Sequence, residues 1–274
     1  MLAHHVEWAH SELWQVSLFV TENLKTASEC RFVHSFHDDE HAYLRGHTIK
    51  GVNVYPFTSA LMCVWDTLSM VYDMPRRSMS VSFHDVHFTT QPVLHEQRQL
   101  RLNVTLHRGT GRFEVNTENT EIASGFIVRK SDKFEETTLT NTNDKDEKLN
   151  LTSDDIYTLL KTYECDYTGE WQSIKSAASS LSQAKVIWKN NWVTLIDSIV
   201  QLNMLKSCQN ASQLDFIRQI TLNVEKFKDV KLDANNEALL DAYIFDILDV
   251  SRCCGVTLKN VRFRSFPVNN ENVS

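Results

Sequence analysis

Two long apolar segments with helical periodicity constrain the fold of this chain more than any other feature. The first is FTSALMCVWDTLSMVYD at residues 57–73, and the second is NWVTLIDSIVQLNMLKSC at residues 191–208. Both are apolar on most faces, so each is expected to form a helix that is buried all round rather than a surface helix. A chain of 274 residues is long enough to enclose each helix in a core of its own.

Strand-like runs accompany each of these helices. In the first half, SMSVSFHDVHF alternates with period two, and QLRLNVTLHR and RFEVNTENTEIASGFIVRK flank a turn at residues 109–111, which predicts a hairpin. In the second half, Ser153 is expected to cap a helix at DDIYTLLKTY. AKVIWK, FIRQITLNVE, EALLDAYIFDILDV and GVTLKNVRFRSF, also in the second half, are mostly strand-like.

Each half therefore predicts one buried helix with several antiparallel strands, which is an α+β fold. A single central helix wrapped by one sheet is a hot-dog fold, and two in tandem make a double hot-dog fold. The polar segment SDKFEETTLTNTNDKDEKLN at residues 131–150 has no helical or strand period and is expected to be a linker. We expect an N-terminal half at residues 1–130 and a C-terminal half at residues 151–274.

Composition excludes several classes of function. The net charge of -7 and the lack of a basic run argue against nucleic acid as a partner. No stretch approaches the roughly 18 consecutive apolar residues of a membrane span, and the N-terminus lacks the apolar region of a secretory signal. The six cysteines show no zinc spacing. These features favour a cytoplasmic protein without a metal site.

His47 opens the pattern His-x-x-x-Gly-x-x-x-x-Pro, which runs through Gly51 to Pro56. A lone histidine ahead of an apolar helix is more often structural than catalytic. The spacing favours chemistry, because Gly51 permits close approach of the backbone and can direct its N–H at a ligand carbonyl. Pro56 suits the start of a buried helix. The pattern makes His47 a candidate base beside a donor for an oxyanion.

Asp197 and Gln201 lie four residues apart inside the second apolar segment, and therefore on one face of its helix. A charged carboxylate is costly to bury among Leu195, Ile196 and Ile199. One interpretation is a structural Asp near the helix start, satisfied by the backbone and by Gln201. The other is an acid whose pKa is raised by its apolar surroundings and which the Gln201 amide holds in place.

Several motifs in order resemble the dehydratase domain of animal fatty acid synthases and the related polyketide synthases. VEWAHSELWQV is similar to the family's tryptophan-rich opening segment, and YLRGHTIKGVNVYP to its first motif. RGTGRFEV is similar to a family hairpin, and WKNNWVTLIDSIVQLNML to the Asp-containing helix. IYTLLKTYECDYTGEWQSI resembles the Gly-Tyr-x-Tyr-Gly-Pro-x-Phe-Gln region. The resemblance covers nearly the whole chain.

The resemblance implies removal of water from a β-hydroxyacyl thioester carried on acyl carrier protein, giving a trans-2-enoyl thioester. It implies that His47 removes the α-proton, Asp197 protonates the departing hydroxyl and Gln201 orients Asp197. The Gly51 backbone N–H would then polarise the thioester carbonyl, and Pro56 and Tyr167 would bind substrate. No metal or organic cofactor is needed. Expected partners are the carrier protein with its phosphopantetheine arm, the other domains of a fatty acid synthase and a second copy in a homodimer.

The chain also departs from the family pattern. At residues 164–171 the family's Gly-Tyr-x-Tyr-Gly-Pro-x-Phe becomes Glu-Cys-Asp-Tyr-Thr-Gly-Glu-Trp, so Tyr167 is kept and the Gly-Pro turn is altered. This change leaves a second interpretation open. The chain would then be a catalytically impaired double hot-dog module with a structural, dimerising or carrier-docking role.

Overall fold

The structure is a computed structural model that describes residues 27–118, 120–130, 148–207 and 212–265. The opening segment that resembles the family and most of the expected linker lie outside the described residues. The division into halves at residues 131–150 stays a prediction, although the last strand of the first half ends at Arg129 and the next strand begins at Leu151.

Both long helices predicted from apolar periodicity are present. Helix α2 spans Phe57–Tyr72 and helix α4 spans Trp192–Ser207, and each has 16 residues. Every residue of α4 from Val193 to Leu205 is buried, as expected for a helix that is apolar on most faces. Helix α2 ends at Asp73, whose φ of 49° is the left-handed conformation that terminates many helices.

Helix α3 spans Ser153–Thr162, and the predicted cap at Ser153 is wrong by one residue. The cap is Thr152, whose hydroxyl accepts a hydrogen bond from the Asp155 backbone N–H at 3.3 Å. The Asp155 carboxylate in turn accepts from the Thr152 N–H at 2.8 Å. This reciprocal capping box satisfies two free donors of the first turn, which Ser153 does not do.

Antiparallel strands form one long sheet and one short sheet. The long sheet contains 12 strands in the order β1-β5-β6-β7-β4-β12-β15-β14-β13-β11-β10-β8. The strands of its first half are β1 Ala27–His34, β4 Val81–Phe88, β5 Leu100–His107, β6 Arg112–Asn116 and β7 Glu121–Arg129. Those of its second half are β8 Leu151–Thr152, β10 Ile174–Ala177, β11 Gln183–Trp188, β12 Ser212–Leu222, β13 Ala238–Phe245, β14 Val250–Cys253 and β15 Val256–Ser265.

The predicted hairpin around residues 109–111 is confirmed as the pair β5–β6. Its second sequence run contains two strands rather than one, because a turn in which the Thr117 N–H donates to the Thr120 carbonyl separates β6 from β7. The run EALLDAYIFDILDV is likewise interrupted by the 3-10 helix η5, Asp246–Leu248. The other 3-10 helices are η1 Asp39–Gly46, η2 Arg76–Ser78, η3 Gly169–Trp171 and η4 Val224–Phe227.

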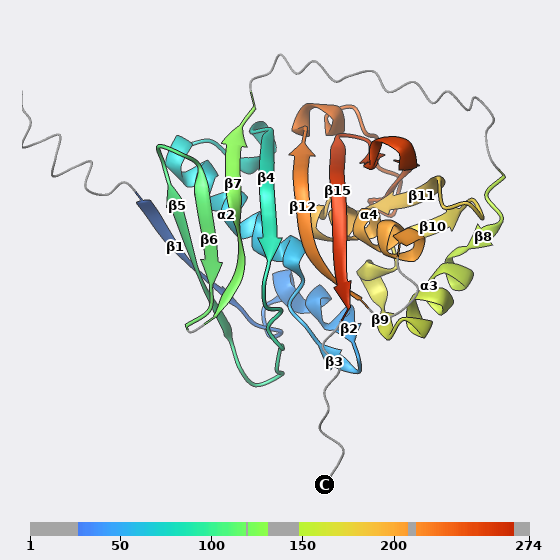
Figure 1. Cartoon of the computed structure of the whole chain (residues 1–274), viewed down its shortest axis with the longest axis horizontal. Helices are drawn as coiled ribbons and strands as arrows, with labels where there is room; N and C mark the ends of the chain where they lie inside the picture. Colours follow the sequence, from blue (N-terminus) through green and yellow to red (C-terminus); the bar gives the residue numbers. More distant parts are fainter. Residues whose placement is uncertain (1–26, 119, 131–147, 208–211, 266–274) are drawn as a thin grey trace, which may run out of the picture.

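The two halves share a single sheet because β4 pairs with β12 at its centre. Figure 1 shows the long sheet in front, with α2 behind the strands of the first half and α4 behind those of the second. Each half therefore repeats one plan, a sheet wrapped around a central helix, as the two apolar segments predict. No helix in the described ranges is both long and apolar enough to cross a membrane.

The short sheet also connects the halves. It has the order β3-β2-β9, with β2 at His47–Ile49, β3 at Val52–Asn53 and β9 at Cys165–Tyr167. Strand β2 pairs with β9 so that His47 lies opposite Tyr167. A residue of the first half is thereby fixed against the C-terminal half, at the lower edge of the view in Figure 1.

Candidate active site

His47 begins strand β2, and its side chain is only 2% exposed. Its Nδ1 lies 3.0 Å from the Val54 carbonyl oxygen. A carbonyl oxygen only accepts, so Nδ1 carries the proton and Nε2 keeps its lone pair. Burial lowers the pKa of His47 to about 4, against the opposing effect of the Val54 hydrogen bond. The ring is therefore a neutral imidazole near neutral pH, with Nε2 able to accept a proton.

Asp197 lies in the second turn of α4 and is 7% exposed. Burial raises the pKa of its carboxyl to about 7, and the hydrogen bond from Gln201 acts in the opposite direction. The helix begins at Trp192, so Asp197 lies beyond the first turn, where the helix dipole has its main effect. Desolvation therefore dominates, and a substantial fraction of the carboxyl is protonated at neutral pH.

Gln201 is held on three sides. Its Nε2 donates to Asp197 Oδ2 at 2.7 Å and to the Trp171 carbonyl oxygen at 3.2 Å. Its Oε1 accepts from the Tyr157 hydroxyl at 3.3 Å, and that hydroxyl accepts from the Ile174 N–H at 2.9 Å. A side-chain amide fixed in this way cannot rotate freely, so Gln201 sets the orientation of the Asp197 carboxyl.

Trp171 is the physical link between His47 and Asp197. Its ring centroid lies 4.6 Å from that of His47, edge to face, while its carbonyl oxygen accepts from Gln201. Its indole Nε1 donates to the Tyr43 carbonyl oxygen at 2.7 Å. His47 and Asp197 are therefore both linked to the turn at residues 168–171, His47 through the Trp171 ring and Asp197 through Gln201.

Gly46 makes this close packing possible. A Cβ at Gly46 would clash with the Thr168 carbonyl oxygen and would lie 2.7 Å from Trp171 Cδ1. The Thr168 N–H donates to the Gly46 carbonyl oxygen at 2.9 Å. The residue immediately before His47 thus fixes the turn that carries Trp171.

The structure places Tyr167 beside this group, Pro56 at the start of α2 and Gly51 in an exposed turn. The Tyr167 ring is buried, with its centroid 5.2 Å from that of His47, and Pro56 is the buried residue that precedes α2. Gly51 is exposed in the turn between β2 and β3, with a φ of +73°. No described residue lies within 4 Å of where its side chain would begin. The glycine serves the turn, and its role as an oxyanion donor stays a prediction.

Sequence reasoning missed three participants. The carbonyl of Val54 orients His47 through the backbone, which leaves no signal in residue type. Tyr157 holds Gln201, and its only signal is its place beside Ile156 on the buried face of α3. Trp171 was not predicted as a site residue, because nothing in its spacing indicates contact with both halves.

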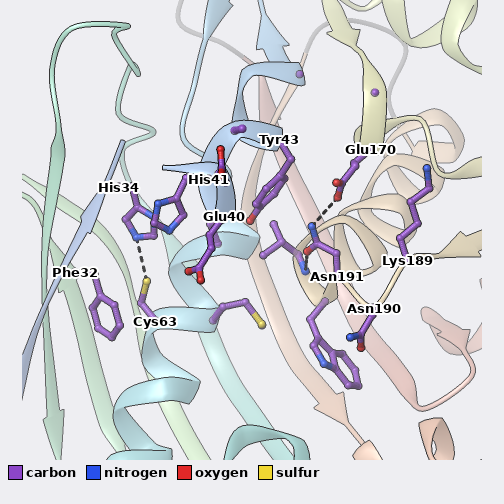
Figure 2. A pocket seen from close by; sticks show the side chains of 18 of the residues that line it. Phe32, His34, Glu40, His41, Tyr43, Cys63, Glu170, Lys189, Asn190 and Asn191 are labelled. Carbon is purple, nitrogen blue, oxygen red and sulfur yellow. Dashed lines mark hydrogen bonds between the residues drawn. The ribbon is translucent and has the colours of Figure 1, made fainter. Parts of the chain in front are cut away.

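Three cavities formed by the described residues have volumes of about 950, 690 and 680 Å³, and neither His47 nor Asp197 lines any of them. The first, called the interhelical cavity below, lies between η1, α2, the turn at residues 168–171 and the start of α4. Figure 2 shows His34, His41 and Cys63 on one side of it and Glu170, Asn190 and Asn191 on the other. In the described ranges, no group of three or more His, Cys, Asp or Glu residues is placed to hold a metal ion.

A sheet wrapped around a central helix, repeated twice and joined through one edge pairing, defines the class of double hot-dog proteins. Residues 18–119, less than half of the chain, match the family described as polyketide synthase dehydratase domain. The matched range includes His47, Gly51 and Pro56.

Solved structures of dehydratase domains share the fold over most of the chain. The dehydratase domain from the CurF module of curacin polyketide synthase has a TM-score of 0.67 at 12% identity, covering 88% of this chain and 93% of that one. The domain from the CurK module has a TM-score of 0.65 at 13% identity, covering 89% and 94%. A trans-AT polyketide synthase dehydratase domain from Brevibacillus brevis has a TM-score of 0.63 at 11% identity, covering 88% and 94%. The predicted α+β double hot-dog fold is confirmed.

Proposed function

We propose that this chain is a β-hydroxyacyl thioester dehydratase that acts on substrates carried by acyl carrier protein. One observation carries the proposal. His47 is a buried neutral imidazole with a free Nε2, and Asp197 is a buried carboxyl whose pKa is raised to about 7. Both are linked to the same turn from opposite halves of the fold. An elimination of water needs one base and one acid whose pKa values are separated in this way.

The proposed reaction balances with these two groups alone. His47 Nε2 takes the α-proton, and the electrons of that C–H bond form the new carbon–carbon double bond. The β-carbon–oxygen bond breaks as Asp197 gives its proton to the hydroxyl, which leaves as water. Charge that develops on the thioester oxygen needs a donor, and the Gly51 N–H is the candidate from the sequence motif. Proton exchange with solvent then restores both groups.

The wider setting is also proposed. The match over residues 18–119 supports a polyketide or fatty acid synthase, with the animal-type fatty acid synthase as the finer assignment. The carrier protein with its phosphopantetheine arm and the neighbouring synthase domains would be the partners, in a cytoplasmic multienzyme that forms a homodimer. Neither a metal nor an organic cofactor takes part in the proposed reaction.

A second candidate function is a double hot-dog module that no longer turns over substrate. The observation that favours it is the burial of His47 and Asp197, which are 2% and 7% exposed. The altered turn at residues 168–171 places the Trp171 ring against His47, where a substrate chain would need room. If the chain catalyses dehydration, the Trp171 ring must move away from His47 to admit the substrate.

Incubation with β-hydroxybutyryl-pantetheine separates the two candidates. Formation of the conjugated enoyl thioester is followed by its absorbance and confirmed by mass, a loss of one water. A dehydratase converts the substrate until it reaches equilibrium with the enoyl product. No product above the protein-free rate, with a folded protein and the carrier-bound substrate also tried, would leave the structural module as the function.

A further inference from the structure

The two central helices and the two central strands of the fold are related by one sequence offset. Helix α4 starts 135 residues after α2, at Trp192 against Phe57, and both helices have 16 residues. At the centre of the long sheet His84 pairs with Gln219, which also lies 135 residues later. In an antiparallel pair, a residue opposite its own equivalent marks a local twofold axis. The two halves are therefore related by an axis through the β4–β12 pair.

This relation maps the acidic face of α4 onto α2. With the offset of 135 residues, Asp197 corresponds to Met62 and Gln201 to Asp66. The neighbouring positions Thr194 and Ser198 correspond to Ser59 and Cys63, completing the face. All four residues on the α2 side line the interhelical cavity: Ser59, Met62, Cys63 and Asp66.

The opposite wall of the cavity obeys the same relation. Residues 189–193, which lead into α4, all line the cavity and correspond to residues 54–58, which lead into α2. Residue 54 is Val54, whose carbonyl orients His47 in the candidate active site. Two walls of the interhelical cavity, the α2 face and residues 189–193, thus correspond to the α4 face and to residues 54–58 of the candidate site.

The groups needed for chemistry are lost at this second position. Met62 stands where the acid Asp197 stands in the candidate site, and a thioether has no proton to give. Strand β11 ends at Trp188, just before α4 begins at Trp192, so the second half has no counterpart of strand β2 and His47 in front of its helix. Asp66 accepts a hydrogen bond from Arg76 Nη1 at 3.0 Å and is held as an ion pair. The cavity can hold a ligand, and although His34, His41 and Glu40 line it, it has no counterpart of the His47–Asp197 pair.

We propose that the interhelical cavity is a second, non-catalytic binding site for an acyl-pantetheine thioester. The ligand class rests on the proposed function, whereas the site rests on the twofold relation and the cavity. Pantetheine is an uncharged chain with amides and a hydroxyl, linked here to an apolar acyl group. The cavity offers Tyr43, Thr168 and Asn190 as neutral hydrogen-bonding side chains and Phe32 and Met62 as apolar surface. Tyr43 and Asn190 lie on different sides of the space in Figure 2.

Fluorine NMR of trifluorobutyryl-pantetheine tests the proposal, because this thioester lacks the β-hydroxyl and cannot be dehydrated. The wild-type protein is expected to show two bound environments. Met62→Trp places an indole in the cavity and is expected to remove one environment, while dehydration of β-hydroxybutyryl-pantetheine stays within about twofold of wild type. Thr194→Trp, on the corresponding face of α4, is expected to remove the other environment and to reduce dehydration at least tenfold.

A melting curve shows whether Met62→Trp folds, and Glu40→Trp at the exposed cavity rim replaces it if it does not. A single bound environment in the wild type, or two that survive both Met62→Trp and Glu40→Trp, overturns the second site. Two environments without any dehydration would instead contradict the proposed function and leave the second site standing. Dehydration together with a single bound environment would support the proposed function and contradict the second site.

Discussion

Gln201 Nε2 donates a 2.7 Å hydrogen bond to Asp197 Oδ2, one helical turn earlier on α4. The same nitrogen donates to the Trp171 carbonyl oxygen, so the amide holds the carboxyl in one orientation relative to the turn that contacts His47. The bond also stabilises the charged carboxylate and lowers the pKa of Asp197, against the larger effect of burial.

Replacing Gln201 with Leu should therefore change both the rate and its pH dependence. Loss of orientation is expected to reduce kcat by roughly tenfold to a hundredfold. Loss of the hydrogen bond removes the group that lowers the pKa of Asp197, so the alkaline limb of the pH–rate profile should move to higher pH. Gln219→Leu on β12 is the control. A lower kcat with an unmoved limb would show that Gln201 acts only through packing.

The pH–rate profile of the wild-type protein should be bell-shaped. His47 must be neutral to accept a proton, so activity falls as the pH drops toward its pKa of about 4. Asp197 must be protonated to give a proton, so activity falls as the pH rises through its pKa of about 7. Rates of β-hydroxybutyryl-pantetheine dehydration between pH 5 and 9 check the alkaline limb. Activity that stays constant up to pH 9 would contradict the role of Asp197 as the acid.

Asp197→Asn should remove dehydration and yet raise stability above pH 4. The folded pKa of about 7 exceeds the ordinary value of 3.8, so ionisation of the unfolded chain costs stability from about pH 4 upward. This cost grows until about pH 7 and then stays constant, on the order of 4 kcal/mol at most. The Asn side chain is neutral at every pH, so the difference in melting temperature should widen from pH 4 to pH 7. A loss of roughly 1.5–3 kcal/mol at pH 7 would instead indicate a structural, ionised Asp.

Gly46→Ala should disturb the site although the change is one methyl group. The new Cβ would meet the Thr168 carbonyl oxygen and Trp171 Cδ1, so the turn at residues 168–171 must shift away from His47. We expect a loss of roughly 1–3 kcal/mol of stability and a lower rate of dehydration. Gly109→Ala is the matched control, because nothing lies within 4 Å of the Cβ it would add. Equal melting curves and rates for the two variants would contradict the role of Gly46.

The elements that the sequence predicted well depend on local periodicity. The helices α2 and α4 begin and end within one or two residues of the apolar segments, because burial on all faces leaves a strong pattern. The cap of α3 was misplaced since Thr152 and Ser153 are both good capping residues, and only the hydrogen bonds with Asp155 decide between them.

The arrangement of the candidate site depends on contacts that leave little local signal. His47 and Asp197 are 150 positions apart, and what joins them is the pairing of β2 with β9 and the packing of Trp171 against His47. The motif also does not reveal that Gly51 lies exposed in a turn. A backbone partner such as the Val54 carbonyl also leaves no signal in the sequence, because every residue carries a backbone carbonyl whatever its side chain is.

The rate of enoyl thioester formation by wild-type protein and by His47→Ala tests the central claim most directly. Alanine removes the only proposed acceptor of the α-proton, and loss of a positioned base typically costs about a hundredfold to ten-thousandfold. We predict that the wild type converts β-hydroxybutyryl-pantetheine and that His47→Ala, with an unchanged far-ultraviolet spectrum, converts it at least a hundredfold more slowly. A His47→Ala protein that retains more than half of the wild-type rate would contradict the account.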